Sequence, residues 1–308
     1  MTIDIIIPTY NRRELLCKLI SSLQSDQASL QVATINIIVA DDKSTDGTRE
    51  AISQQFQDVL IVEGPGRNAE MAKRTAIESS KGDFIVCLDD DCIPRHGWIA
   101  VVLPLLERGE KIVQSKVIFY DFGQEDLQDE APPNFRVGFR FDMMPVAQLN
   151  GGYRPQYIEF SHEFGCFIAR EVLKHTPLDD PNLVGDKFGS SASFSLRARQ
   201  LGYRVFFEPA SVIDHWGSQT GGFKDRVQKV QTKKECTPYV INLVHNFFYF
   251  GRKYRPLRVP ILIPYYLVGG LYLSLKQRKN CLHYFIQGIR NGLTAPIKPV
   301  VPYQRMGT

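Results

Sequence analysis

Residues 3–23 read I-D-I-I-I-P-T-Y-N-R-R-E-L-L-C-K-L-I-S-S-L, and this stretch decides the fold. Its β-branched run over residues 3–7 is closed by Pro8, which predicts a short buried strand. After a polar segment, apolar residues return at helical spacing over residues 15–23, which predicts an amphipathic helix. A strand followed at once by such a helix is the repeating unit of a parallel sheet.

The same unit recurs further along the chain. Further strands are predicted over residues 35–40, 59–62 and 84–88, and further helices over residues 49–56 and 68–80. Strands that alternate with helices imply parallel crossovers, so the predicted fold class is α/β, an open sheet with helices on both faces. Residues 111–219 contain more aromatic residues, glycine and proline, which predicts mixed strands and loops and makes the sheet a mixed one.

The charges divide the chain into two unequal parts. Of the 308 residues, 44% are hydrophobic and 23% charged, which excludes a disordered or fibrous protein. Residues 1–223 hold 22 basic and 31 acidic side chains, whereas residues 224–308 hold 15 basic and 2 acidic ones. This asymmetry predicts an acidic working domain followed by a basic segment that meets an anionic surface, with a solvated basic face as the alternative.

The cysteines and the N-terminus indicate a cytoplasmic protein. The cysteines form no C-x-x-C pair and do not cluster with histidine, which argues for reduced thiols and against a structural zinc site. The first residues contain neither a basic segment nor a small-residue cleavage site, so no secretory signal is expected. The six cysteines are Cys17, Cys87, Cys92, Cys166, Cys236 and Cys281.

Three polar loops follow predicted strands, at residues 8–12, 41–46 and 89–91. Because ligands of open α/β sheets bind outside the carboxyl ends of the strands, these loops are expected to meet at one crevice. Three consecutive carboxylates raise one another's pKa values unless a cation intervenes, and a divalent metal is the simplest remedy. Oxygen ligands suit Mg²⁺ or Mn²⁺, which take phosphate oxygens as further ligands. A solvated acidic loop is the alternative.

Four motifs occur in the first hundred residues: P-T-Y-N-R at 8–12, D-D-K-S-T-D-G-T at 41–48, G-R-N-A at 66–69 and L-D-D-D at 88–91. Together they resemble the motifs of the family 2 glycosyltransferases of the GT-A fold. Within that family the resemblance is to bacterial polysaccharide glycosyltransferases and rhamnosyltransferases. It implies a UDP-, GDP- or dTDP-linked sugar as the donor. The positions implied to contact this nucleotide sugar are Pro8, Thr9, Tyr10, Arg12, Asp41, Asp42, Arg67, Asn68, Lys73, Asp89 and Asp90.

The resemblance also implies a D-x-D element, in which Asp89 and Asp91 hold Mn²⁺ or Mg²⁺ on the diphosphate. The cation neutralises the charge that grows on the departing nucleoside diphosphate. Arg67 or Lys73 adds a positive contact there, or else lies on the surface of a helix. His215 is a candidate metal or diphosphate ligand, with a purely structural role as the alternative.

The second half continues the resemblance. Residues 165–170 are similar to the segment that frames the acceptor side in relatives, and Arg197, Gly202, Pro209 and His215 match the family stretch L-x-x-R-x-x-x-x-G…P…H.

One departure concerns the general base. Relatives carry an acidic pair just before that stretch, where this chain has Ser190, Ser191 and Ser193, and serine does not accept a proton near neutral pH. Asp186 is the nearest carboxylate and is predicted to be the catalytic base. The other possibilities are Asp179, Asp180 and Glu163. A different base, a different stereochemical course and an inactive copy all stay open.

The basic segment contains long apolar runs. A helix is predicted after Thr237 and Pro238, and residues 259–275 contain no charged residue. The second run is shorter than the roughly 20 residues of a spanning helix, contains two prolines and two glycines, and has basic residues at both ends. It therefore predicts a helix lying in the plane of an anionic membrane surface, with a membrane span or a buried helix as alternatives. Nucleic acid is not expected as a partner, because the apolar content exceeds what phosphate binding needs.

These observations predict a metal-dependent, inverting glycosyltransferase that acts on a hydroxyl of a glycan or lipid-linked acceptor. The predicted location is the cytoplasmic face of the cell membrane. Residues 1–223 form the GT-A domain, with a nucleotide-sugar half over 1–110 and an acceptor half over 111–223, and residues 224–308 form a helical extension. A nucleotidyltransferase would need a basic glycine-rich signature after the first strand, which the chain lacks there. A non-catalytic binding protein that has lost its base is the remaining alternative.

Overall fold

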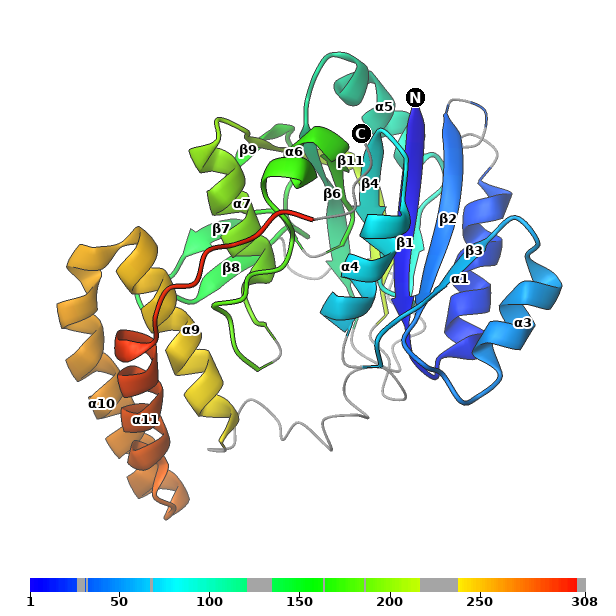
Figure 1. The fold of residues 1–308 in the computed structure, drawn as a ribbon. Coiled ribbons are helices and arrows are strands. Elements are labelled where there is room, and N and C mark those ends of the chain that lie inside the picture. Colours follow the sequence, from blue (N-terminus) through cyan, green and yellow to red (C-terminus); the bar gives the residue numbers. More distant parts are fainter. Residues whose placement is uncertain are drawn as a thin grey trace.

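The computed structural model describes residues 1–26, 31, 33–66, 69–120, 135–162, 164–185, 187–216 and 238–303. Its centre is a nine-stranded sheet with the order β3-β2-β1-β4-β10-β6-β11-β5, to which β9 is added beside β11 (Figure 1). The strands are β1 (Thr2–Thr9), β2 (Thr34–Asp41), β3 (Leu60–Glu63), β4 (Phe84–Cys87), β5 (Cys92–Pro94), β6 (Ile112–Phe119), β9 (Gln156–Ile158), β10 (Cys166–Ala169) and β11 (Val205–His215).

The sheet is mixed, as predicted. Strands β3, β2, β1 and β4 run parallel to one another, and β10 is antiparallel to both β4 and β6. Strand β11 is parallel to β6 but antiparallel to β5 and β9. The predicted strands agree with β1 to β4 to within two residues at each end, although β1 continues through Pro8 to Thr9.

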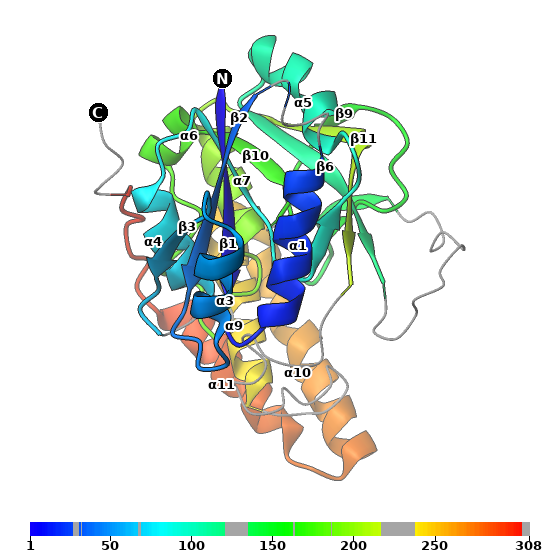
Figure 2. The same cartoon turned by 90° about the vertical axis from the view of Figure 1, so that its right-hand side faces the viewer.

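Helices cover both faces of the parallel half, as predicted, and Figure 2 shows α1 and α4 on opposite sides of β1. The isoleucines of β1 are buried because both of its faces are covered, which explains the unbroken apolar run. Burying each such side chain contributes about 1.5–3 kcal/mol. The helices of this half are α1 (Arg13–Ser25), α3 (Thr48–Gln55), α4 (Ala69–Ser79) and α5 (Trp98–Glu107).

A second hydrophobic core joins residues 143–196 to the C-terminal helices. Met143, Phe160, Leu183 and Ala192 pack there with residues of three helices at the C-terminal end. The predicted helical extension is therefore present, and part of its apolar content is explained by packing against the rest of the protein. The remaining elements are β7 (Arg136–Phe139), β8 (Pro145–Gln148), α6 (Arg170–His175), α7 (Ser190–Gln200), α9 (Tyr239–Tyr254), η1 (Pro256–Arg258), α10 (Val259–Gln277) and α11 (Cys281–Thr294).

Helices α9 and α11 approach each other closely at two glycines of α11. A Cβ atom on Gly288 would lie 2.7 Å from Cβ of Val244, and one on Gly292 would lie 2.6 Å from Cβ of Phe248. Such distances are shorter than carbon atoms tolerate, so the crossing requires glycine at both positions.

Helix α10 is the exposed member of the group. With η1 it forms a 22-residue helical segment, long and apolar enough to cross a membrane, and 17% of its most apolar 18-residue window is buried. Pro260 lies in the first turn and Pro264 is accommodated inside the helix, so the prolines do not interrupt it as the sequence suggested. Its exposed apolar side chains, together with Leu257 of η1, are Ile261, Tyr265, Val268, Leu271, Tyr272 and Leu275.

After α11 the chain returns to the first core, as the red segment of Figure 1 shows. The Lys298 N–H donates to Oδ1 of Asn182 at 2.6 Å, and the buried Tyr303 packs in the first core. The Tyr303 hydroxyl accepts a hydrogen bond from the Leu178 N–H at 3.0 Å.

Candidate active site

The three predicted polar loops meet at one edge of the sheet. The Asp42 N–H donates to the Thr9 carbonyl at 2.9 Å, which joins the loops after β1 and β2. The Thr9 hydroxyl donates to Oδ2 of Asp90 at 2.9 Å, which joins the loop after β1 to the one after β4. The expected convergence at the carboxyl ends of parallel strands is confirmed, because β2, β1 and β4 are neighbours in the sheet.

The loop after β2 is held by its own polar side chains. Asp41 accepts from the Ser44 N–H at 3.1 Å, and Asn11, in the left-handed conformation at φ +52°, accepts from the Thr45 N–H at 2.7 Å. Asp42 is buried and accepts from the Gly66 N–H at 2.6 Å, which ties β2 to the loop after β3. Pro8, a predicted nucleotide-sugar contact, lies inside β1. Tyr10, another predicted contact, follows the strand and is half-buried. The predicted Arg67 and Asn68 lie outside the described residues.

Each of the three consecutive carboxylates has a cationic neighbour. Arg12 Nη1 lies 2.6 Å from Oδ1 of Asp90 and 3.1 Å from Oδ2 of Asp91. Lys73 Nζ lies 3.6 Å from Oδ1 of Asp89. Lys73 is buried, so the alternative of a surface helix residue is excluded. The protein's own cations thus offset part of the repulsion for which the sequence suggested a metal as the simplest remedy.

His215 reaches the same group from the other end of the sheet. It lies opposite Cys92 in the antiparallel pairing of β11 with β5, and its Nε2 is 3.2 Å from Oδ1 of Asp91. Its ring stacks on Phe164 at 4.8 Å between centroids, and the Trp216 N–H donates to the Asp91 carbonyl at 3.0 Å. Strand pairing, not proximity in sequence, therefore places this histidine beside the acidic loop.

Burial and these contacts shift the pKa values of the group. Burial raises the pKa of Asp90 to about 6, against the lowering effect of Arg12. Burial lowers the pKa of His215, but the hydrogen bond and charge of Asp91 outweigh it, so the net pKa lies above the ordinary value. His215 therefore carries a larger share of positive charge near neutral pH than a free histidine does.

The donor atoms at this edge fit a divalent cation in part. Atoms of Asp91, Cys92 and His215 lie within 4.8 Å of one another, which is the spacing of ligands around one ion. Burial raises the pKa of the Cys92 thiol well above its ordinary value, so this thiol stays protonated and is a poor ligand. The Asp91 carboxylate and the His215 imidazole remain, with the half-exposed Asp89 two residues before Asp91. A carboxylate-rich set of this kind suits Mn²⁺ or Mg²⁺.

A pocket of about 430 Å³ opens between the β7–β8 hairpin and the N-terminal end of α7. Its inner end is lined by Ser161 and His162. The His162 ring lies 4.4 Å from that of Phe164, which in turn stacks on His215, so this end of the pocket adjoins the acidic loop. Burial, with the charge of His215, lowers the pKa of His162 to about 4, and this histidine is neutral at pH 7.

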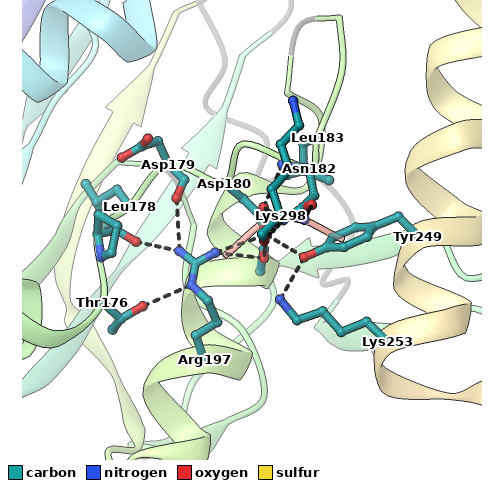
Figure 3. Close-up of polar contacts among 12 residues, drawn as sticks. Thr176, Leu178, Asp179, Asp180, Asn182, Leu183, Arg197, Tyr249, Lys253 and Lys298 are labelled. Carbon is teal, nitrogen blue, oxygen red and sulfur yellow. Dashed lines mark hydrogen bonds and ion pairs between the residues drawn. The ribbon is translucent and has the colours of Figure 1, made fainter. Parts of the chain in front are cut away.

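A buried ion pair fixes the chain beside this pocket (Figure 3). Asp180 is 1% exposed and accepts from Arg197 Nη1 at 3.0 Å and from the Tyr249 hydroxyl of α9 at 2.8 Å. The Ser193 hydroxyl, at a position where relatives carry an acid, also donates to Asp180. Burial raises the pKa of Asp180, but these donors outweigh it and the net pKa is lowered. A carboxylate so bound is a structural anchor and a weak proton acceptor.

Helix α9 also holds the backbone that flanks Asp186. The Asn246 side chain is fully buried, accepts from the Val184 N–H at 3.0 Å and donates to the Val184 and Phe188 carbonyls at 3.3 Å each. His245 Nε2 lies 3.2 Å from the Asn182 carbonyl. Asp186, the predicted base, lies outside the described residues, as does Glu163, and Asp179 pairs with Arg74 at 3.2 Å.

The sequence did not indicate the roles of Asn246, Tyr249 and His162. The family stretch marked Arg197, but its carboxylate partner and the α9 residues lie far away in the chain. Buried polar residues in an apolar helix were the one available signal, since asparagine and histidine are rarely buried without hydrogen-bond partners.

Comparison with known proteins identifies the class of protein that this fold and site define. Glycosyl transferase family 2 matches residues 4–175, more than half of the chain, and the protein belongs to this family. This family of glycosyltransferases is the one that the sequence predicted. The fold is similar to TarS 1–349 of S. aureus in complex with UDP-GlcNAc (TM-score 0.55, 13% identity, covering 94% of this chain and 82% of that one). It is also similar to the mannosyltransferase PcManGT of Pyrobaculum calidifontis in complex with GDP-Man and Mn²⁺ (TM-score 0.54, 17% identity, 95% and 87%).

Three curated relatives share parts of the sequence. Glycosyltransferase AglE of Haloferax volcanii is 23% identical over 67% of this chain and 64% of its own length. The GalNAc(5)-diNAcBac-PP-undecaprenol beta-1,3-glucosyltransferase of Campylobacter jejuni is 31% identical over 35% of each chain. The poly(ribitol-phosphate) beta-glucosyltransferase of Bacillus spizizenii is 31% identical over 30% of this chain and 15% of its own. The chain thus matches less than two thirds of the length of each of these relatives.

Proposed function

We propose that this protein transfers a sugar from a nucleoside diphosphate to a hydroxyl of a glycan or lipid-linked acceptor, with inversion at the anomeric carbon and with Mn²⁺ or Mg²⁺ as cofactor. The observation that carries the proposal is the meeting of the loops after β1, β2 and β4 with His215 at one edge of the sheet. PcManGT, whose fold is similar, was solved with GDP-Man and Mn²⁺, which supports the donor class and the metal.

The nucleotide contacts fall to the first two loops. Asp42, with Arg67 and Asn68 beyond β3, is proposed to bind the base and ribose, because Asp42 already links these segments through Gly66. Arg12 and Lys73 are the cations beside the acidic loop, and they offset negative charge on the departing diphosphate.

The metal is assigned to Asp91, His215 and Asp89. When bound, the cation neutralises the negative charge that develops on the leaving nucleoside diphosphate. The His215 Nε2 atom lies 3.2 Å from Oδ1 of Asp91, so these two proposed ligands are neighbours.

The base is assigned to Asp186. In the sequence it stands between Val184 and Phe188, the two residues whose backbone Asn246 fixes, and Phe188 lines the pocket. A carboxylate at this place removes the proton of the attacking acceptor hydroxyl as the bond to the sugar forms. The serines at 190, 191 and 193 do not accept that proton, and Ser193 donates its own to Asp180.

The membrane is the proposed working surface. Helix α10 exposes apolar side chains along its length and is preceded by Arg255 and Arg258 and followed by Arg278 and Lys279, which suits an anionic interface on the cytoplasmic side. The Campylobacter jejuni relative is named for a glycan linked to PP-undecaprenol, and this name supports a lipid-linked acceptor for the present protein.

The test is release of nucleoside diphosphate from a panel of UDP-, GDP- and dTDP-sugars, with Mn²⁺ present or chelated. We expect one donor class to be consumed only with the metal, and Asp91→Asn to lower that rate at least ~100-fold. Asp58→Asn, an exposed acid on the surface, is the matched control and keeps the wild-type rate. Consumption of no donor, or full activity of Asp91→Asn with chelator, would contradict the proposal.

A further inference from the structure

The pocket between the β7–β8 hairpin and α7 has ends of different chemistry. At its inner end, the half-buried His162 and Ser191 present an imidazole and a hydroxyl group beside the half-buried aromatic Phe188. Hydroxyls and aromatic faces of this kind bind sugar rings, whose surfaces alternate polar and apolar patches. The inner end adjoins His215 through Phe164, so a sugar held there lies next to the proposed donor site.

The outer rim of the pocket is cationic. Arg136 and Arg140 of the β7–β8 hairpin line it, and no carboxylate is found among the described residues of its lining. Arg140 pairs with Asp142 at 3.2 Å, whereas Arg136 is exposed and forms no ion pair with any described residue. Two guanidinium groups at one rim suit a phosphate or diphosphate group, to which arginine donates two hydrogen bonds at once.

An apolar surface continues outward from this rim. Phe141 follows Arg140 in the hairpin turn, is 55% exposed, and packs edge-on against Tyr265 of α10 at 5.7 Å between ring centroids. Arg258, at the start of α10, donates to the Arg140 carbonyl at 3.3 Å. The turn is thus fixed to α10, and Arg140, which lines the pocket, is followed in the chain by Phe141, which contacts that helix.

The order of these chemistries names the acceptor class. We propose that the pocket binds a sugar that is joined to a lipid through a phosphate or diphosphate group. The sugar occupies the inner end, the phosphates bind Arg136 and Arg140, and the lipid lies along Phe141 and the exposed face of α10. This inference rests on the proposed function and adds the chemical identity of the acceptor. A neutral glycan would leave the arginines unused, and a soluble phosphorylated sugar would leave the apolar face unused.

The test is calorimetric binding to the full chain with three probes: farnesyl diphosphate, farnesol and inorganic pyrophosphate. We expect farnesyl diphosphate to bind at least ~10-fold more tightly than either of the others, because only it engages both the rim and the apolar face. Arg136→Gln and Arg140→Gln each weaken its binding roughly 10-fold, the loss expected for hydrogen bonds to a charged group. Arg199→Gln, an exposed arginine on α7, is the control and binds as the wild type does.

Two results would overturn the assignment. Equal binding of farnesol and farnesyl diphosphate, or unchanged binding by both rim variants with wild-type unfolding curves, removes the phosphate from the rim. Displacement of farnesyl diphosphate by UDP, GDP or dTDP places the probe in the donor site instead. Binding of UDP, GDP and dTDP to the wild-type protein with Mn²⁺ is measured in parallel without acceptor. Its presence with failed lipid binding sinks only the acceptor assignment, whereas its absence sinks the proposed glycosyl transfer itself.

Discussion

Replacing Asn246 with alanine tests whether α9 positions the proposed base. The side chain is fully buried and makes hydrogen bonds to the Val184 N–H, the Val184 carbonyl and the Phe188 carbonyl. Its removal leaves the Val184 N–H without a hydrogen-bond partner, and the Val184 and Phe188 carbonyls each lose one donor. The unsatisfied N–H alone costs about 1–3 kcal/mol, so we expect the free energy of unfolding to fall by about 3 kcal/mol in total.

The effect on catalysis exceeds the effect on binding. Val184 and Phe188 bracket Asp186, and a displacement of the base by about 1 Å costs up to ~100-fold in rate. We therefore expect kcat to fall 10- to 100-fold while donor affinity stays within about twofold. Asn291→Ala, an exposed asparagine on α11, is the matched control and changes neither quantity.

The assays are urea unfolding, steady-state turnover with donor binding, and hydrogen exchange of the amides around Val184. Faster exchange there, with donor affinity unchanged, identifies a positioning role. If Asn246→Ala turns over at the wild-type rate although exchange at Val184 is faster, the loop does not carry the base and this reasoning is wrong.

Three further outcomes are expected. Asp186→Asn lowers turnover at least ~100-fold in donor-saturated assays while calorimetric donor affinity stays normal, and an unchanged rate removes Asp186 from its role. Burial holds the pKa of His162 at about 4, below its unfolded value, so part of the wild-type unfolding free energy, at most about 3 kcal/mol, is lost between pH 6.5 and 4. Urea unfolding across this range shows a smaller loss in His162→Phe, and an identical pH profile refutes the burial effect. Gly292→Ala lowers the unfolding free energy by about 2 kcal/mol, because the new Cβ atom meets Phe248. In the same assay Gly269→Ala, whose Cβ atom would lie 4.0 Å from its nearest neighbour, is neutral or stabilising by up to about 1 kcal/mol. Equal effects of the two substitutions contradict the close crossing of α9 and α11.

The parallel half of the fold was readable from the sequence because its signals are local. Each strand is a β-branched run and each helix has its own apolar spacing, so boundaries agree to within a few residues. The carboxyl-end rule then placed Thr9, Asp42 and Asp90 together without further information.

The compensation of the acidic loop was not readable from the sequence. Arg12 meets Asp90 across 78 residues of chain, and His215 reaches Asp91 only because β11 pairs with β5. Contacts of this kind depend on strand order, which periodicity does not encode. The metal was predicted as the simplest remedy for three adjacent negative charges, whereas Arg12, Lys73 and His215 supply part of the compensating positive charge.

The C-terminal helices show a similar limit. Their apolar residues predicted a membrane surface, but half of the α9 residues are buried, several of them in the second core, and of these three helices only α10 exposes a long apolar face. Both uses require the same residue types, so composition does not separate them. A chain cut near residue 223 would uncover this second core, and side-chain changes on α10 are the better test of membrane binding.

The return of the chain after α11 has a consequence for which acceptors are reached. Lys298 and Tyr303 anchor one end of the helical group to the body of the protein, and the α9 contacts anchor the other. Because the helical group is attached to the protein at both ends, α10 has little freedom to rotate relative to the sheet. When α10 lies on a bilayer, the proposed active site is held at a fixed distance from the lipid. Acceptor hydroxyls are then selected by their distance from the membrane surface.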